Sequence, residues 1–480
     1  MEQKQPKVLK IYFLTEMWER CGFYVIQSLL IFYLINTLHL SDKLSYGILG
    51  SITALSYSNT VIGGYISDRL IGHRVAVLLA ALMLSVGYGS LSAVDNINMI
   101  ILALSFITMG VGLLVPSVRC MVGLLYDAND ERRHSGFTFC YIGVNTGIII
   151  GETVAGGIQH HFGWHSVFLS SSIVLLFCFF TFWLGTRYFR ITNSIVIISK
   201  NKWLFTIFIL LGAIILGYYV IQRQTIASIF FFLVAFLCLI YVVYAAYKAQ
   251  NFMRKRFVAF LLLMLISTLY WAMYFQMFFS MNLFVERIVD RNFLGITLLP
   301  TTFPAIEACT VIVAGPFFVW AWRWLPRRYP RFNPTVFMKF SLALLIQCLA
   351  FGLLFLGSLM QNVNGLINPE WFIPPYILIG VGELLLMPIS LAMVGELLPS
   401  SIMGVMIGIF LISLALGGKL AGWFANITDI PEAIGANIFA VAHIYQHSFF
   451  LYFIFSIVIA VMSLFLVPLL KKLVKTTDSQ

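Results

Sequence analysis

Charged residues are scarce in this chain. Asp, Glu, Lys and Arg account for 10% of its 480 residues, whereas 60% of the residues are hydrophobic. A soluble protein carries about 25% charged residues, so this composition excludes one. It predicts an all-α membrane protein, because each run of about 20 apolar residues can cross a bilayer as a helix.

Several functional motifs are also missing. The seven cysteines stand singly in apolar runs without a C-x-x-C pair, which is typical of buried side chains and not of a disulfide or metal framework. Because no G-x-x-x-x-G-K loop is present, we do not expect ATP to drive the protein. No catalytic Ser/His, paired-Asp or metal set falls at membrane depth. We therefore expect no enzyme activity, no metal and no cofactor.

Fourteen apolar segments between polar breaks are long enough to cross a membrane. Because the number is even, both termini are expected on one side. The first segment is too long for the apolar part of a cleavable signal peptide, so none is expected. The segments run near residues 11–38, 46–67, 75–94, 98–126, 136–159, 165–186, 203–221, 225–247, 257–285, 296–322, 335–360, 371–398, 402–425 and 444–470.

Lys and Arg are divided unequally between the two sides of this topology. Of the 30 such residues, 23 fall on the side of the termini, 4 on the opposite side and three inside segments. Positive residues favour the cytoplasmic side, so both termini are predicted to be cytoplasmic in the inner cell membrane. The net charge of +11 is then a topology signal, and we expect no nucleic-acid partner.

Three charged residues lie together in the first apolar segment. Glu16, Glu19 and Arg20 have the spacing i, i+3 and i+4, which places them on one face of a helix. Each charge at membrane depth costs about 2.5–3.5 kcal/mol on insertion scales, so the cluster must pair internally or line a wet cavity. Arg20 can neutralise one carboxylate while the other binds and releases a proton. The alternative is a structural ion pair between packed helices.

The loop from Gly64 to Arg74 reads G-Y-I-S-D-R-L-I-G-H-R. It resembles the G-x-x-x-D-x-x-x-G loop with two following basic residues in the major facilitator superfamily. The resemblance implies that Asp68 caps or pairs across a helix end, and that Gly64 and Gly72 allow close turns. Arg69 or Arg74 is expected to pair with a neighbouring helix.

This resemblance implies the major facilitator fold, in which two six-helix bundles rock about a central site. With two extra helices, the chain would have fourteen. We expect an N-terminal bundle in residues 1–190, a linker with the two extra helices in 191–256 and a C-terminal bundle in 257–480. The extra helices are expected to form a lateral hairpin outside the transport pathway.

Several motifs together indicate one family. Glu16, Glu19 and Arg20 form E-x-x-E-R, and Tyr24 follows. The chain resembles the proton-dependent oligopeptide transporters over nearly its whole length. Residues matching their second signature are Asp130, Arg132, Arg133, Gly136, Phe137, Tyr141, Asn145, Gly147, Gly163 and Trp164. Later matches are Tyr270-Trp271-Ala272, Gln276, Asn282-Leu283-Phe284, Gly382-Glu383, Pro388 and Met393-Val394.

The resemblance implies a proton-coupling set and a substrate site. Glu16, Glu19 and Arg20 are expected to couple protons, and Glu383 is expected to receive the amino group of a peptide. The residues expected around the substrate are Tyr24, Gln27, Arg119, Tyr141, Asn145, Trp271, Gln276, Asn282 and Glu383.

The chain departs from the family where charge is expected. Gln27 replaces an arginine, Val115 a lysine and Phe275 an acid, so two cationic contacts and one titratable group are missing. Proton coupling must then depend on the first or tenth helix of the two bundles. Further departures are Phe23 for a tyrosine, Ser117 for an asparagine, Glu152 for a proline and Phe303 for an asparagine.

Four additional charges fall inside apolar segments: Arg119, Glu152, Glu307 and Lys419. Arg119 lies one helical turn, about 6 Å, after Val115 and on the same face. If it balances Glu19 or Glu152, the cavity stays negative and favours a substrate with an amine. Alternatively, Glu152 pairs with Lys419 or Arg119 away from the cavity.

These observations favour a proton-coupled symporter that imports di- and tripeptides or peptide-like compounds by alternating access. Its partners would be the substrate, protons and the lipid bilayer, its driving force the proton gradient, and its state monomeric. One alternative is a proton-coupled transporter of a cationic amine or amino acid. Another, suggested by the missing acid, is a nutrient sensor that binds substrate without transporting it.

Overall fold

The structure, a computed structural model, describes residues 5–126, 130, 132–188, 199–293, 295–329, 335–398, 403–431, 434 and 437–474. Helices dominate this part of the chain, and a small antiparallel pair joins β1 (Asn292–Phe293) to β2 (Ile296–Thr297). The chain divides into two compact units. One comprises Met1–Leu40 and Gly47–Ala227, the other Ser41–Tyr46 and Ser228–Gln480.

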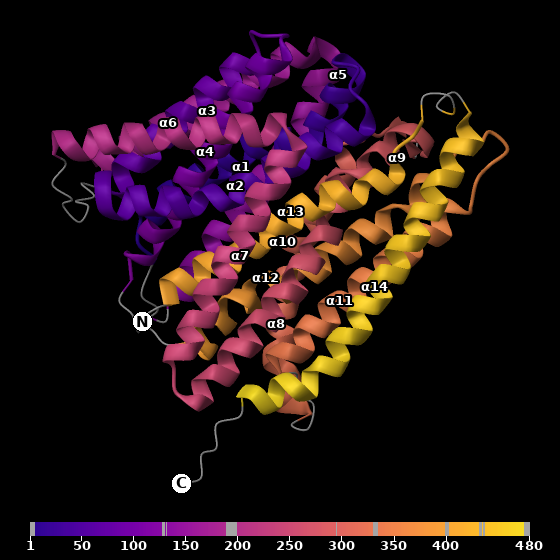
Figure 1. Ribbon diagram of the computed structural model, residues 1–480. Helices are drawn as coiled ribbons and strands as arrows, with labels where there is room; N and C mark the ends of the chain where they lie inside the picture. The colour runs from indigo at the N-terminus through magenta and orange to yellow at the C-terminus, as the bar shows by residue number, and fades with distance from the viewer. Residues whose placement is uncertain are drawn as a thin grey trace. The chain divides into compact units, whose positions relative to one another are not determined.

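The first unit is built from the helices drawn in indigo to magenta in Figure 1. In α5, Gly163 adopts a φ of 77°, which favours glycine and separates two helical stretches. Short π-helical turns extend α1 and α2, and α6 packs on α4. The helices are α1 (Leu9–Phe32), α2 (Asp42–Tyr65), α3 (His73–Leu91), α4 (Ile97–Gly123), α5 (Arg132–Tyr188) and α6 (Lys200–Gln222).

The tight packing of α5 on α1 depends on three glycines spaced four residues apart. A Cβ at Gly143 would lie 2.8 Å from the Phe13 ring, and one at Gly151 would lie 2.5 Å from the Cys21 carbonyl oxygen. A Cβ at Gly147, between them, would collide with the backbone of α1. Small residues at this spacing form one helix face and let two membrane helices approach closely. The backbone of α1 is therefore held directly against α5.

The second unit contains most of α7 and the helices after it. Figure 1 shows α11 and α14 side by side, and these two helices pack together. In the same unit α12 packs on α10 and α11, and α13 packs on α8. The helices are α7 (Gln224–Lys248), α8 (Asn251–Tyr274), α9 (Ser280–Ile288), α10 (Thr302–Arg328), α11 (Val336–Ser358), α12 (Ile373–Leu397), α13 (Met403–Ala425) and α14 (Ile438–Val474).

The first turn of α2 packs with the second unit, although the rest of this helix belongs to the first. Arg287 on α9 donates two hydrogen bonds to the Asp42 carboxylate, at 2.7 and 2.8 Å. The hydroxyl groups of Tyr46 and Thr428 lie 2.9 Å apart. A two-pronged guanidinium contact of this kind fixes orientation as well as distance. These contacts explain why Ser41–Tyr46 groups with the second unit.

Each of the fourteen predicted segments overlaps a helical stretch. Segments 136–159 and 165–186 are the two parts of α5, and segment 257–285 comprises α8, a 3₁₀ turn (Phe275–Phe278) and α9. In the described part of the chain, ten helices are long and apolar enough to cross a membrane. With its central charges, α1 is not among these ten.

The two predicted extra helices, α6 and α7, differ in how they pack. The first belongs to the first unit, whereas most of α7 falls in the second. Large apolar side chains on both are exposed, among them Phe208 at 74% and Phe232 at 69%. Such exposure is typical of a surface that faces lipid. The predicted boundaries and the lateral hairpin stay predictions.

Candidate functional site

The three charged residues of α1 are all buried, with exposed fractions of 5% for Glu16, 1% for Glu19 and 7% for Arg20. Arg20 donates from Nε and Nη2 to the two carboxylate oxygens of Glu19, at 2.6 and 3.0 Å. Its guanidinium also lies 4.8 Å from the centre of the Phe23 ring, within the range of a cation–π contact. Glu19 and Arg20 therefore form a closed ion pair at membrane depth.

Glu16 has a different cation beside it. Nε of Arg119, on α4, lies 3.8 Å from Oε1 of Glu16, and 40% of the Arg119 side chain is exposed. Arg119 thus forms its ion pair with Glu16, and its charge also acts on Glu19, as one of the two suggested pairings requires. The negative charges of two carboxylates and the positive charges of two guanidiniums thus balance. One of the two pairs, Glu16–Arg119, is partly exposed.

Glu152 belongs to neither pair. It lies fully buried on α5, where Oε1 accepts a hydrogen bond from the Ser28 hydroxyl at 2.8 Å. The predicted pairing of Glu152 with Arg119 is therefore not formed. Lys419 lies on α13 in the second unit, and its pairing with Glu152 stays a prediction.

The other residues predicted for the first half of the substrate site have local partners. Gln27 is 1% exposed and exchanges hydrogen bonds with the Thr53 hydroxyl at 3.2 Å, so it links α1 to α2. Asn145 is 2% exposed and donates to the Tyr141 carbonyl oxygen at 3.0 Å in its own helix. Tyr24 is buried and Tyr141 is half-buried.

In the second unit, Tyr274 contacts both Glu383 and Trp271. The Tyr274 hydroxyl donates to Oε2 of Glu383 at 2.7 Å, and the Trp271 ring meets the Tyr274 ring edge-on with centroids 4.9 Å apart. Tyr274 was not among the predicted residues. Its position one helical turn after Trp271 is the sequence signal that points to it.

Two other predicted substrate residues are fully buried, Gln276 and Asn282. Gln276 donates to the Ala421 carbonyl oxygen on α13 at 2.9 Å and accepts from the Ser280 hydroxyl at 2.7 Å. These bonds give Gln276 a role in joining α8, α9 and α13. Glu307 is 1% exposed on α10, and Lys419 is half-buried.

The Gly64–Arg74 loop forms the π-helical end of α2 and the start of α3. Gly72 has a φ of 74°, so the turn requires a glycine, whereas a Cβ at Gly64 would meet open space. Within the described part of the chain, Arg69 and Arg74 make no ion pair. The expectation that one of them pairs with a neighbouring helix is not met among these residues and stays a prediction for the rest of the chain.

Asp68 instead contacts a histidine that also contacts a cysteine. Nε2 of His73 lies 3.4 Å from the Asp68 carboxylate and 3.2 Å from Sγ of Cys120 on α4. The three possible ligand atoms lie within 4.8 Å of one another, a grouping that zinc can accept. No sequence spacing reveals it, because Cys120 is 47 residues from His73. Asp68 thus pairs across a helix end.

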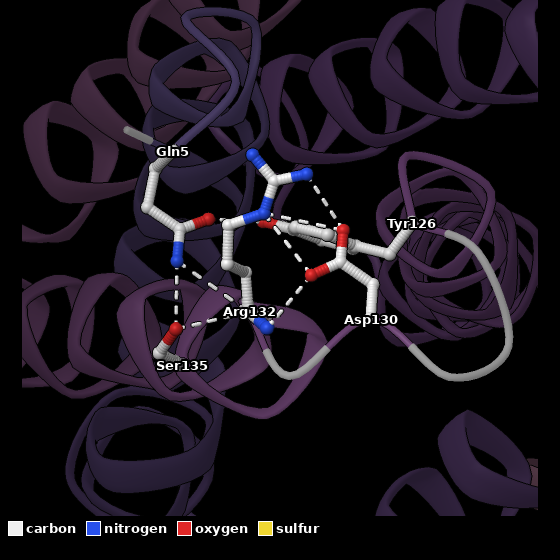
Figure 2. Close-up of polar contacts among 5 residues, drawn as sticks. All are labelled: Gln5, Tyr126, Asp130, Arg132 and Ser135. Atoms are coloured by element: carbon white, nitrogen blue, oxygen red, sulfur yellow. Dashed lines mark hydrogen bonds and ion pairs between the residues drawn. The ribbon is translucent and has the colours of Figure 1, made fainter. Parts of the chain in front are cut away.

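A second polar cluster joins the segment before α1 to the start of α5, as Figure 2 shows. Arg132 donates from Nε, Nη2 and its backbone N–H to Asp130, and these contacts lower the pKa of that carboxyl. The Tyr126 hydroxyl donates to the side-chain oxygen Oε1 of Gln5 at 2.7 Å, and Nε2 of Gln5 donates to the Ser135 hydroxyl at 2.6 Å.

Gly136 is required beside this cluster, because a Cβ there would collide with the Tyr126 hydroxyl. Five members of the second signature, Asp130, Arg132, Gly136, Gly147 and Gly163, therefore serve helix ends, helix packing and a turn. The side chain of Arg133 lies outside the described residues.

Comparisons with known proteins place these features in a family. Residues 74–441 match the PTR2 model, described as the POT family. The dipeptide and tripeptide permease A of Erwinia pyrifoliae is 28% identical, over 99% of this chain and 96% of that protein. A di-/tripeptide transporter of Lactococcus lactis is 25% identical, over 80% of this chain and 82% of that protein.

Solved structures share the fold. Tetrameric PepTSo2 superposes with a TM-score of 0.85 at 22% identity, covering 97% of this chain and 98% of its own. A peptide transporter POT in complex with sulfate superposes with a TM-score of 0.81 at 24% identity, covering 98% and 96%. These likenesses confirm the predicted major facilitator fold. The family match spans most of the chain, and the chain therefore belongs to the POT family, which its motifs predicted.

Proposed function

We propose that this protein is a proton-coupled secondary symporter that imports di- and tripeptides or peptide-like compounds by alternating access. The POT family consists of transporters and not enzymes, and the relatives above are named as permeases or transporters of di- and tripeptides. The buried charge cluster of α1 supports proton coupling. Ionisable groups at membrane depth are costly, and proteins keep them there mainly where they serve transport or form pairs.

One observation carries this proposal: the two carboxylate–guanidinium pairs Glu19–Arg20 and Glu16–Arg119 in the first unit. A proton bound by either carboxylate removes the charge that holds its guanidinium. Once freed, the buried Arg20 guanidinium must find water or a substrate carboxylate, because an unpaired buried charge costs several kcal/mol, whereas Arg119 is already partly exposed. Proton binding thus biases the balance between two conformations.

Glu383 supports recognition of the amine end of a substrate. Its carboxylate is only half-buried and is oriented by the Tyr274 hydroxyl. Trp271 packs against that tyrosine and adds an aromatic surface beside the carboxylate. In the first unit, the guanidinium of Arg119 is partly exposed beside Glu16 and can bind a carboxylate group.

A cationic amine or amino acid is the second candidate substrate, and the neutral, hydrogen-bonded side chain of Gln27 favours it. This residue replaces an expected arginine, and its amide is engaged by Thr53. The site then has fewer groups for a substrate carboxylate than for an amine. A nutrient sensor stays an alternative because Phe275 replaces the acid expected in the seventh core helix.

We further propose that the protein lies in the inner membrane as a monomer with both termini cytoplasmic. The division of Lys and Arg supports this orientation, and no cofactor is required beyond the proton gradient. Among the structural neighbours, PepTSo2 is tetrameric. Cross-linking in membranes tests the oligomeric state, and labelling of single cysteines placed at each terminus tests the orientation.

Transport by the purified protein in proteoliposomes tests the proposed function. An inward proton gradient is expected to drive accumulation of a labelled dipeptide above its external concentration, and a protonophore is expected to abolish it. Amines or amino acids that accumulate in place of dipeptides would favour the second candidate. Ligands that raise the melting temperature without any uptake would identify a sensor and refute the symporter.

A further inference from the structure

Glu152 is a buried carboxyl group outside the α1 charge cluster. It has no exposed surface, and its Oε1 accepts one hydrogen bond, from the Ser28 hydroxyl. Within the part of the chain that the structure describes, Oε2 has no hydrogen-bond partner. Among the described residues of the first unit, no Lys, Arg or His nitrogen lies within 4.0 Å of this carboxyl.

The ionisable groups around Glu152 are engaged elsewhere or lie farther along their helices. On α1, Arg20 is eight residues from Ser28, about 12 Å along the helix axis. It is bound to Glu19, and on α4 Arg119 lies beside Glu16. None of the following forms a hydrogen bond or ion pair with Glu152: Lys10, Glu16, Glu19 and Arg20 on α1; His73, Arg74 and Tyr88 on α3; Arg119 on α4; and Cys140, His160, His161 and His165 on α5.

An ionised carboxylate is not stable in such surroundings. One neutral hydroxyl cannot replace the hydration of a full charge, and a buried carboxyl without a cation neutralises itself by binding a proton. The observed environment therefore selects the protonated form of Glu152.

The position of Glu152 makes its access to water depend on the packing of α1. It follows Gly151, whose Cα lies close to the Cys21 carbonyl oxygen, and its partner Ser28 lies two turns farther along α1. The neighbouring residue Gln27 ties the same turn of α1 to α2. A shift of α1 against α5 would therefore open this seam and hydrate the carboxyl.

We infer that Glu152 is a proton-binding site of the transport cycle. It holds a proton while the α1–α5 seam is closed and transfers that proton to water when the seam opens, leaving a hydrated carboxylate. This inference rests on the proposed symport, and it adds a proton carrier separate from the Glu16, Glu19 and Arg20 set.

An infrared measurement tests the protonation state without any transport. The purified wild type at neutral pH is expected to show the infrared carbonyl band of a protonated carboxylic acid. In the Glu152→Gln protein, the intensity of this band is expected to fall by the contribution of one carboxylic acid group. The matched control Glu370→Gln removes an exposed carboxyl and should leave the band unchanged. A band of equal intensity in the Glu152→Gln protein would overturn the inference.

Proton stoichiometry tests the role in the cycle. In proteoliposomes, the reversal potential of uptake gives the protons moved per substrate, and Glu152→Gln is expected to lower this number by one while exchange of substrate continues. Glu152→Asp, which keeps a titratable group, and Ser28→Ala, which removes only the hydroxyl, should retain the wild-type number.

The two measurements separate failure of this inference from failure of the proposed function. If the wild type takes up no dipeptide under a proton gradient, the symporter is refuted, and the infrared band alone decides whether Glu152 binds a proton. If Glu152→Gln keeps the wild-type stoichiometry, Glu152 is a structural acid and the inference is wrong. Melting temperatures of all variants report whether each remains folded.

Discussion

The substitution Glu19→Gln tests whether Glu19 stabilises the fold as the partner of Arg20, carries the proton in transport, or does both. Glu19→Gln keeps the size of the side chain but removes its charge and one of the two acceptors for Arg20. Removing one partner of a buried ion pair costs about 3–5 kcal/mol. Because the amide retains one acceptor oxygen, we expect a loss of about 2 kcal/mol. With an unfolding entropy proportional to chain length, this loss lowers the melting temperature by about 2 °C.

Glu16→Gln provides the matched comparison. The Glu16–Arg119 contact is longer, at 3.8 Å, and its arginine is 40% exposed. Contacts of this kind contribute about 1 kcal/mol or less, so the melting temperature should fall by under about 1 °C. If Glu16→Gln destabilises the protein as much as Glu19→Gln, the assignment of the tighter pair to Glu19 is refuted.

Transport assays of the same variant distinguish proton coupling from structure. Accumulation driven by a proton gradient should be lost in Glu19→Gln, because the amide cannot bind and release a proton. Exchange of labelled for unlabelled substrate, which needs no net proton movement, should persist in part. Equal loss of both modes would show that Glu19 has a structural role only.

Three further predictions concern packing, substrate affinity and pH. Gly147→Ala places a Cβ against the backbone of α1 and should destabilise the protein by about 1–3 kcal/mol, whereas Gly157→Ala in the same helix meets open space and should be neutral or stabilising by up to about 1 kcal/mol; equal melting temperatures would contradict this. Tyr274→Phe removes the hydrogen-bond donor to Glu383, a contact worth about 1 kcal/mol, and should raise KM for a dipeptide roughly fivefold without changing the maximal rate. The control is Tyr247→Phe, at an exposed tyrosine. An unchanged KM in Tyr274→Phe would exclude the contact from substrate binding. The pKa of Asp130 is lowered by Arg132, so its stabilising effect is present above the ordinary Asp pKa of about 3.9 and is lost as pH falls through the lowered value; Asp130→Asn should flatten the decline in melting temperature on acidification, and a profile as steep as that of the wild type would refute this.

The sequence alone determined the helical segments and the family. Runs of about 20 apolar residues can satisfy their backbone groups in lipid only as helices or barrels, so the fourteen segments were visible without any tertiary contact. The spacing of Glu16, Glu19 and Arg20 also follows from helix geometry. Motifs such as E-x-x-E-R are local in the chain, and they identified the family before any packing was known.

Only the tertiary structure decided which charged groups meet. The partner of Arg119 depends on the face that α4 presents to α1, and no spacing within α4 fixes that face. The family motifs place Gln27 and Gln276 among the expected binding residues. In the structure, however, their side-chain amides form hydrogen bonds to α2 and α13. The sequence also does not show whether Glu152 has a cation beside it in the folded protein. Its isolation follows from the close approach of α5 to α1, because packing and not local sequence determines which polar groups share a buried space.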